Sequence, residues 1–227
     1  MLREVDPDAR HALVAASDSR QVAKGEVLFH LGDEPEAAFL IVEGEIKLSR
    51  PLPGDWNQAG HENIIAIYGP GQVFGEVTIV DPGPRSNSAT AITPAKLLFV
   101  PRAEVERLLH DYPSLSRALL KYLGRRLRIA HGMMSSLIVH DVPGRVADIL
   151  LMLMDRFGER RADGVHVRHE LTQADIAHMV GSSREAVNKA LTEFATRGWI
   201  HVGTKSFTVF NEQRLRARIG ENQSMFR

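Results

Sequence analysis

The stretch that most constrains the fold is residues 171–197, LTQADIAHMVGSSREAVNKALTEFATR. Thr172 is a good helix N-cap, and Asp175 is a short acid that favours the first helical turn. Apolar residues follow at helical spacing until Gly181, so the pattern predicts one short helix that ends there. The apolar face of this helix is formed by Ile176, Met179 and Val180.

A second helix is predicted directly after it, with Ser182 or Ser183 as the N-cap. Its buried face is formed by Val187, Leu191 and Phe194. Four polar side chains point outward together near its N-terminal end: Arg184, Glu185, Asn188 and Lys189. Because Arg can donate two hydrogen bonds to guanine and Glu can accept one from cytosine, this helix suits base reading in the major groove. The alternative is an ordinary surface helix pair with solvated charges.

Residues 198–210, GWIHVGTKSFTVF, predict two strands around a turn at Gly203-Thr204-Lys205, a hairpin or wing. Lys205 at its tip either contacts a phosphate or is a solvated turn residue. The charge distribution favours a polyanionic partner for this half of the chain. Residues 1–110 carry 10 Lys and Arg against 16 Asp and Glu, whereas residues 111–227 carry 18 against 12.

Length and composition limit the class of protein. A chain of 227 residues, 44% of them hydrophobic, predicts two modest domains. No apolar run approaches the roughly 20 residues that span a bilayer, and the N-terminus lacks the apolar core of a secretory signal. The absence of cysteine excludes disulfides, iron–sulfur clusters and thiolate zinc sites. We therefore expect a soluble cytoplasmic protein with no membrane partner.

The first half of the chain predicts a β-rich domain. Residues 20–100 contain short apolar runs separated by glycine-rich turns, which is typical of a sandwich or barrel-like roll. The runs are VLFH, AFLIVEG, EIKLSR, NIIAIYG, QVFGEV, SATAIT and AKLLFVP. The segment PLPGDWNQAG (51–60) predicts a long exposed hairpin loop.

The pattern changes to a helical period from Ser114 to about Val139. A heptad seam runs through Leu120, Leu123, Leu127, Ala130, Met134 and Leu137. We interpret it as a parallel two-fold coiled coil of a homodimer, since two-fold DNA sites call for a dimeric reader. The alternative is a helix that packs on its own domain.

The segment His140–Gly144 then predicts a hinge, because Pro143 disfavours helix at Val142. Residues 145–158 predict a second apolar-striped helix. The expected fold class is α+β, with an N-terminal jelly-roll-like β-roll over 1–112, a long dimerisation helix over 113–140 and a C-terminal winged helix-turn-helix domain over 141–227.

This order of elements resembles the cyclic-AMP receptor protein (CRP/FNR) family of bacterial transcription regulators, and the resemblance covers nearly the whole chain. The matching segments are FGEVTIVDPGPRSNSA (74–89), DVPGR (141–145) and LTQADIAHMVGSSREAVNKAL (171–191). Several stretches, among them DPGPR and VNKAL, look most like actinobacterial members. The resemblance implies a cyclic-nucleotide effector, a palindromic double-stranded DNA operator and a second copy of the chain as partners.

Residues 74–89 match the family's phosphate-binding cassette. Gly75 lets the backbone approach a ligand, and the turn after it offers free N–H groups to an anion. The resemblance implies that the ligand-binding residues include Gly75, Glu76, Val77, Arg85 and Ser86. Arg85 would pair with the cyclic phosphate, Ser86 would add a hydrogen bond, and Glu76 would accept from the ribose 2′-hydroxyl. The alternative is a turn with an internal Glu76–Arg85 ion pair.

The base end of the pocket departs from the family pattern. Members that bind cyclic AMP present Thr followed by Ser or Asn to adenine, whereas Ala130 and His131 stand at these positions. Because Ala130 cannot make a side-chain hydrogen bond, discrimination for adenine should fall. Cyclic AMP is the first expectation for the effector. A weaker or different pose, another nucleotide such as cyclic di-GMP, and regulation without a ligand remain open, and His131 could equally be a seam residue.

For DNA, the resemblance points to Arg184, Glu185 and Lys189 as base readers, beside Asn188 on the same face. Residues expected near phosphates are Thr172, Gln173 and Ser183. Lys189 replaces the family's Arg and lacks its bidentate fork, so specificity at that base should be looser. The expected operator is related to TGTGA…TCACA. Loop 157–165 is either a contact for RNA polymerase or a solvated connector.

Other functions have little support in the sequence. We find no GxSxG elbow, HExxH motif, P-loop or cysteine nucleophile, so the chain is not expected to be an enzyme. No metal site is predicted. His30, His61 and His110 lie in no recognisable haem-ligation context.

Overall fold

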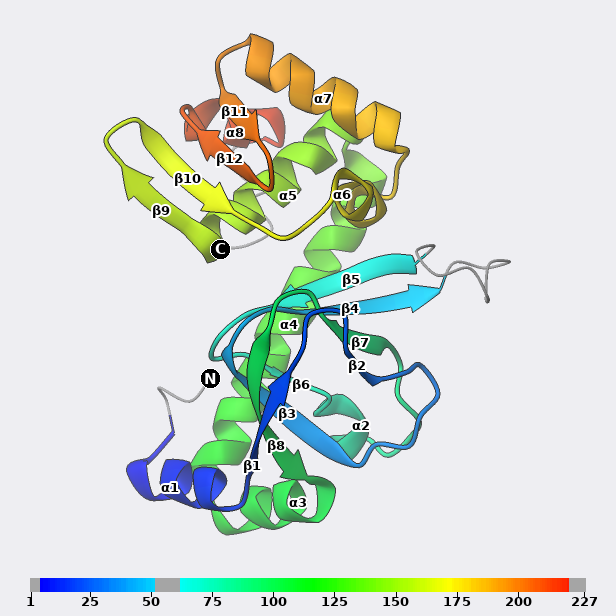
Figure 1. The fold of residues 1–227 in the computed structure, drawn as a ribbon, viewed down its shortest axis with the longest axis vertical. Coiled ribbons are helices and arrows are strands. Elements are labelled where there is room, and N and C mark those ends of the chain that lie inside the picture. The colour runs from blue at the N-terminus through cyan, green and yellow to red at the C-terminus, as the bar shows by residue number, and fades with distance from the viewer. Residues whose placement is uncertain (1–4, 52–61, 221–227) are drawn as a thin grey trace. The chain divides into compact units, whose positions relative to one another are not determined.

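The computed structural model describes residues 5–51 and 62–220 (Figure 1). Its contacts divide the chain into two compact units, Met1–Arg125 and Arg126–Arg227, whose boundary falls inside the long helix α4 (Pro113–Val139). The predicted α+β class is confirmed. The division into three parts at residues 112 and 140 stays a prediction. No helix in the described part of the chain is long and apolar enough to cross a membrane.

The first unit contains a β-roll built from two four-stranded antiparallel sheets in the described residues (Figure 1). One sheet has the order β1 (Asp18–Val22), β8 (Ala95–Pro101), β3 (Ala37–Glu43), β6 (Val73–Phe74). The other has the order β2 (Val27–Phe29), β7 (Ser88–Ala91), β4 (Ile46–Pro51), β5 (Glu62–Tyr68). The predicted strands are therefore present. Strand β1 was missed, because four of its five side chains are exposed and it lacks an apolar signal. The predicted loop after Pro51 lies outside the described residues, apart from Pro51 itself.

Aromatic rings fill the core of the roll. Phe39 stacks on Phe74 with ring centroids 4.9 Å apart, and Phe99 meets Phe39 edge-on at 5.6 Å. Such pairs stabilise the folded state by about 0.5–1.5 kcal/mol beyond what the burial of their area contributes. Phe29 completes the cluster, 5.8 Å from Phe39.

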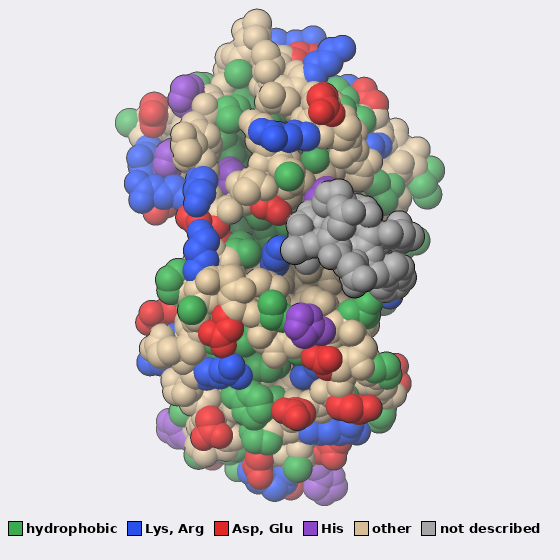
Figure 2. All heavy atoms as spheres, turned by 45° about the vertical axis from the view of Figure 1, so that its right-hand side comes forward, with side chains coloured by type: hydrophobic (Ala, Val, Ile, Leu, Met, Phe, Trp, Pro, Cys, Tyr) green, Lys and Arg blue, Asp and Glu red, His purple; other side chains and the backbone are tan. Residues whose placement is uncertain are grey.

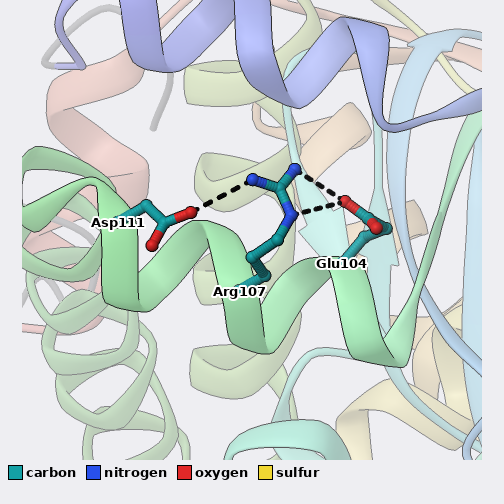
Figure 3. Close-up of polar contacts among 3 residues, drawn as sticks. All are labelled: Glu104, Arg107 and Asp111. Carbon is teal, nitrogen blue, oxygen red and sulfur yellow. Dashed lines mark hydrogen bonds and ion pairs between the residues drawn. The ribbon is translucent and has the colours of Figure 1, made fainter.

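Two helices that the sequence analysis did not predict pack beside the roll: α1 (Pro7–Ala15) and α3 (Arg102–Asp111). Their buried residues join Val5, a residue of β8 and the start of α4 in one apolar cluster of Val5, Ala9, Val100, Leu108, Leu115 and Ala118. On the exposed side of α3, Arg107 lies between Glu104 and Asp111 at 2.7 and 3.1 Å (Figure 3). Both carboxylates raise the pKa of Arg107, Glu104 more strongly.

Helix α4 begins on the roll and continues as an apolar stripe. Tyr122 is buried with Leu119, and its hydroxyl donates to the Val73 carbonyl at 2.7 Å. Leu123 is half-buried against the same cluster, which at this position fits the alternative of packing on its own domain. The other large apolar side chains of the seam are exposed, by 71% at Leu120, 57% at Leu127, 62% at Met134 and 55% at Leu137.

The second unit holds the C-terminal helices around one four-stranded sheet of the described residues, with the order β11-β12-β10-β9. Its helices are α5 (Val142–Phe157), α6 (Gln173–Val180), α7 (Arg184–Thr196) and α8 (Glu212–Arg218). Its strands are β9 (Gly158–Arg161), β10 (Gly164–Arg168), β11 (Ile200–Gly203) and β12 (Ser206–Val209). The predicted wing is present as β11 and β12. The segment interpreted as loop 157–165 is instead the β9–β10 hairpin, whose exposed GERR strand has no apolar alternation.

The DVPGR segment makes a tight connection. Asp141 caps α5 by accepting from the Gly144 N–H at 3.0 Å, and Pro143 sits in the first turn, where a missing N–H costs nothing. The prediction that Val142 lies outside the helix was therefore wrong: α5 starts at Val142, three residues before the predicted start. Arg145 donates to two carbonyl oxygens, that of His140 at 2.9 Å and that of Val180 at 2.8 Å.

A buried polar contact lies beside this connection. Asp148 on α5 is 1% exposed and accepts a hydrogen bond from the Ser136 hydroxyl of α4 at 2.6 Å. Burial raises the pKa of Asp148, and the hydrogen bond from Ser136 opposes that rise. The contact joins the last turns of α4 to α5 within the second unit.

Candidate nucleotide site and DNA interface

The cassette begins where β6 ends at Phe74. Gly75 has φ +76°, a backbone conformation that side chains other than glycine rarely adopt. A Cβ at this position would lie 2.9 Å from Arg85 Nη1 and 3.3 Å from the Ala37 carbonyl oxygen. The short helix α2 (Val77–Val80) follows directly. Glycine is required here both for the backbone and for the close approach of Arg85.

Arg85 is the centre of the cassette and is only 4% exposed. Nη2 donates to the Ala37 carbonyl at 2.6 Å, and Nη1 donates to the Gly75 carbonyl at 2.7 Å and to the Thr78 hydroxyl at 3.2 Å. The guanidinium lies over the Phe29 ring, 4.2 Å from its centroid. Arg85 therefore connects β3, the turn after β6 and α2.

The charges around Arg85 are mostly negative. Burial lowers the pKa of Arg85, while the nearby carboxylates of Glu76, Asp33 and Glu36 raise it and partly offset the cost of burial. Glu76 is itself buried. The hydrogen bonds of the guanidinium go to backbone carbonyls and a hydroxyl, and the attraction of Glu76 adds to them. The alternative of an internal Glu76–Arg85 ion pair is therefore met only in part, as a longer-range attraction between these two charges.

The guanidinium still has donors to offer an anion. Its Nε is buried and has no hydrogen-bond partner among the described residues. A buried donor without an acceptor is costly, and an anionic oxygen is the acceptor that a guanidinium binds best. The chemistry of this donor fits a phosphate group.

The other predicted ligand-binding residues are dispersed. Val77 and Ser86 are exposed at the cassette. Ala130 and His131 are exposed on α4, in the second unit. A pocket that joins them to the cassette stays a prediction. Sequence analysis missed Phe29, Ala37 and Thr78 as partners of Arg85. Only Thr78 lies in the quoted cassette, and nothing in the sequence marks Ala37, which acts through its backbone.

The helix-turn-helix is formed by α6 and α7, and each helix has the predicted cap. Thr172 and Asp175 make a reciprocal capping box, in which the Thr172 hydroxyl also donates to the Asp175 carboxylate at 2.8 Å. Gly181 ends α6 in the left-handed region, at φ 65°. Ser183 caps α7 by accepting from the Ala186 N–H at 3.2 Å. The backbone N–H and the hydroxyl of Thr172 therefore both donate to the Asp175 carboxylate.

The predicted base-reading side chains share one exposed face of α7: Arg184, Glu185, Asn188 and Lys189. The opposite face is buried through Val187, Ala190, Leu191 and Phe194. Hydrogen bonds from its own backbone N–H and from the Ser183 hydroxyl hold the pKa of Glu185 below its ordinary value, so this carboxylate is an ionised acceptor. Figure 2 shows Lys and Arg side chains at the surface of this unit, at the upper end of the view.

The wing tip carries Lys205 in the left-handed region, at φ 53°. Its Nζ forms an ion pair with the Glu170 carboxylate at 2.8 Å, and its carbonyl accepts from the His169 N–H at 3.0 Å. The wing tip is therefore held beside the segment that leads into α6. The Lys205 side chain is about half exposed, and its contact with DNA stays a prediction.

The chain has clear relatives. Residues 19–112 match the family described as "Cyclic nucleotide-binding domain", and residues 144–218 match the "Crp-like helix-turn-helix domain". Over 214 residues the chain is 41% identical to the "CRP-like cAMP-activated global transcriptional regulator" of Mycobacterium tuberculosis, covering 94% of this chain and 93% of that protein.

Solved structures agree with this likeness. FixK2 from Bradyrhizobium japonicum matches with a TM-score of 0.76 and 25% identity over 88% of this chain and 96% of its own. The c-di-GMP responsive regulator CLP of Xanthomonas campestris matches with a TM-score of 0.76 over 90% of this chain and 99% of its own, and at 20% identity it shows the fold alone. The M. tuberculosis relative is named as a transcriptional regulator, and the resemblance inferred from the sequence is confirmed. The chain therefore belongs to the CRP/FNR family of DNA-binding transcription regulators and has actinobacterial relatives.

Proposed function

We propose that the protein is a homodimeric, sequence-specific DNA-binding regulator whose β-roll binds a cyclic nucleotide and thereby controls operator binding allosterically. The observation that carries the proposal is the exposed polar face of α7, because Arg184, Glu185, Asn188 and Lys189 are all accessible on one side of a helix whose other side is buried. Such a helix fits the major groove. The protein would act in the cytoplasm, where its operator lies.

The apolar stripe on α4 supports the dimer. Leu120, Leu127 and Met134 recur every seven residues and are each more than half exposed. Soluble monomers rarely leave such a continuous apolar row in water, and a heptad spacing is what a parallel helix pair buries. Two copies would present two α7 helices about 34–36 Å apart, one turn of DNA. The β9–β10 hairpin, with its exposed strand β9, is our candidate contact for RNA polymerase.

Cyclic AMP is the first candidate effector, because the M. tuberculosis relative is named as cAMP-activated and the Nε donor of Arg85 fits a phosphate. When bound, the nucleotide would supply the anionic oxygen to which Arg85 Nε can donate. Ala130 offers no side-chain hydrogen bond to an adenine, which favours weak discrimination between bases. A regulator that responds to cyclic di-GMP, as the X. campestris neighbour is named, or that works without ligand is the second candidate.

Fluorescence anisotropy on a palindromic duplex related to TGTGA…TCACA and on a scrambled duplex tests the DNA-binding function. We expect preference for the palindrome and affinity that falls steeply with salt. Calorimetric titration with cyclic AMP, cyclic GMP and cyclic di-GMP tests the effector. Equal affinity for both duplexes in every titration would refute the proposed regulator, whereas operator preference without nucleotide heat would establish the ligand-independent candidate.

A further inference from the structure

Gln173 occupies an unusual place in the helix-turn-helix. It is the first residue of α6, is half-buried, and contacts two side chains of α7. Its Oε1 accepts from Arg184 Nε at 3.5 Å, and its Nε2 donates to Asn188 Oδ1 at 3.3 Å. Both polar atoms of this one amide are therefore directed at two of the predicted base readers.

We propose that Gln173 is a positioning residue for DNA specificity, which orients Arg184 and Asn188, rather than a phosphate contact as the sequence analysis expected. The proposal rests on the proposed DNA-binding function. It concerns how one base pair of the operator is discriminated, which the family likeness does not state.

The backbone on both sides of this contact is fixed. The capping box of Thr172 and Asp175 holds the first turn of α6. The Ser183 cap holds the first turn of α7, whose first residue is Arg184. Gln173 thus connects the capped N-terminal ends of α6 and α7 through side-chain contacts. Both contacts are longer than the usual 2.9–3.0 Å, as expected for exposed groups that water can also solvate. Their strength should grow when DNA excludes that water.

The geometry assigns a role to each end of the amide. With Nε of Arg184 directed at Gln173, both Nη groups remain for the guanine O6 and N7 acceptors. With Oδ1 of Asn188 accepting from Gln173, both hydrogens of its Nδ2 remain, so we expect Asn188 to act as a donor to DNA. Orienting a long arginine before binding lowers the entropy cost of ordering it at the interface.

The test compares Gln173→Met, Gln173→Glu and the matched control Gln213→Met, on an exposed residue of α8, in the full chain. Operator affinities are measured for every single base-pair change in a half-site, and Arg184→Ala identifies the base pair that Arg184 reads. In Gln173→Met we expect discrimination at that base pair to fall about five- to tenfold, while positions that neither Arg184 nor Asn188 contacts and the salt dependence stay unchanged. At the Arg184 base pair, the double variant Gln173→Met/Arg184→Ala should discriminate no worse than Arg184→Ala alone.

Gln173→Glu separates positioning from affinity. Its carboxylate still accepts from Arg184, so discrimination at the Arg184 base pair should persist, while affinity for all duplexes falls because a negative charge meets phosphates. An equal loss for all sequences in Gln173→Met, or additive effects in the double variant, would overturn the proposal and make Gln173 a phosphate contact.

A measurement without DNA keeps the two proposals apart. Nitrogen relaxation of the Arg184 Nε–H in the free protein reports its order, which we expect to fall in Gln173→Met and not in Gln213→Met. An unchanged order refutes positioning even if operator binding is specific. A chain that binds all duplexes alike refutes the proposed function, and the relaxation result then decides the positioning role alone.

Discussion

Replacing Arg85 with Leu should destabilise the roll even when no nucleotide is added. The guanidinium donates to the carbonyls of Ala37 and Gly75 at 2.6 and 2.7 Å, and a leucine leaves both acceptors without it. A buried polar group that loses its partner costs about 1–3 kcal/mol, and the lost stacking on Phe29 adds about 0.5–2 kcal/mol. Relief from burying a cation offsets part of this loss. We therefore expect a net loss of about 3 kcal/mol.

The assay is urea and thermal unfolding followed by circular dichroism, in nucleotide-free buffer. For a chain of this size the loss corresponds to a fall in Tm of roughly 6–12 °C. Arg107→Leu is the matched control, since Arg107 also makes three side-chain hydrogen bonds, but to Glu104 and Asp111 on the exposed face of α3, so its removal should lower stability far less. Equal stability of the two variants would refute the structural role of Arg85. If the role holds, loss of nucleotide binding in Arg85→Leu cannot be ascribed to a missing phosphate contact alone.

Three further predictions concern the second unit and α4. Because the folded pKa of Asp148 is raised, its contribution to stability is present at low pH and is lost as pH rises through that pKa. Asp148→Asn should therefore be the more stable form at pH 7, and its stability in urea titrations should fall less as pH rises above the ordinary pKa of an aspartate. An unchanged profile would contradict this. Leu127→Asp should give a folded monomer by light scattering at micromolar concentration, whereas a persistent dimer would contradict the seam. Lys205→Ala should weaken binding to all duplexes alike and make the slope of log affinity against log salt shallower by about one. An unaltered slope would show that Lys205 is a turn residue without a phosphate contact.

Sequence reasoning succeeded where short-range chemistry decides the structure. The capping box at Thr172, the left-handed Gly181 and the Ser183 cap each act within a few residues, so α6 and α7 could be predicted closely. The short strands of the roll were recognisable for the same reason, as apolar runs between glycines.

Long-range packing could not be predicted in this way. The heptad spacing of α4 does not distinguish Leu123, which packs on the roll, from Leu127, which is exposed. The Ala37 carbonyl that accepts from Arg85 lies 48 residues away and has no side-chain signature. The β9–β10 hairpin was missed because its charged strand is held by pairing with β10 rather than by an apolar face.

The two carbonyl contacts of Arg145 have a mechanical consequence. A single planar cation links the chain directly after α4, at His140, to the last residue of α6, at Val180. Because Arg145 lies in the first turns of α5, this one side chain holds the end of α4, the start of α5 and the end of α6 together. The end of the long helix and the helix-turn-helix therefore share a single guanidinium as their common hydrogen-bond donor.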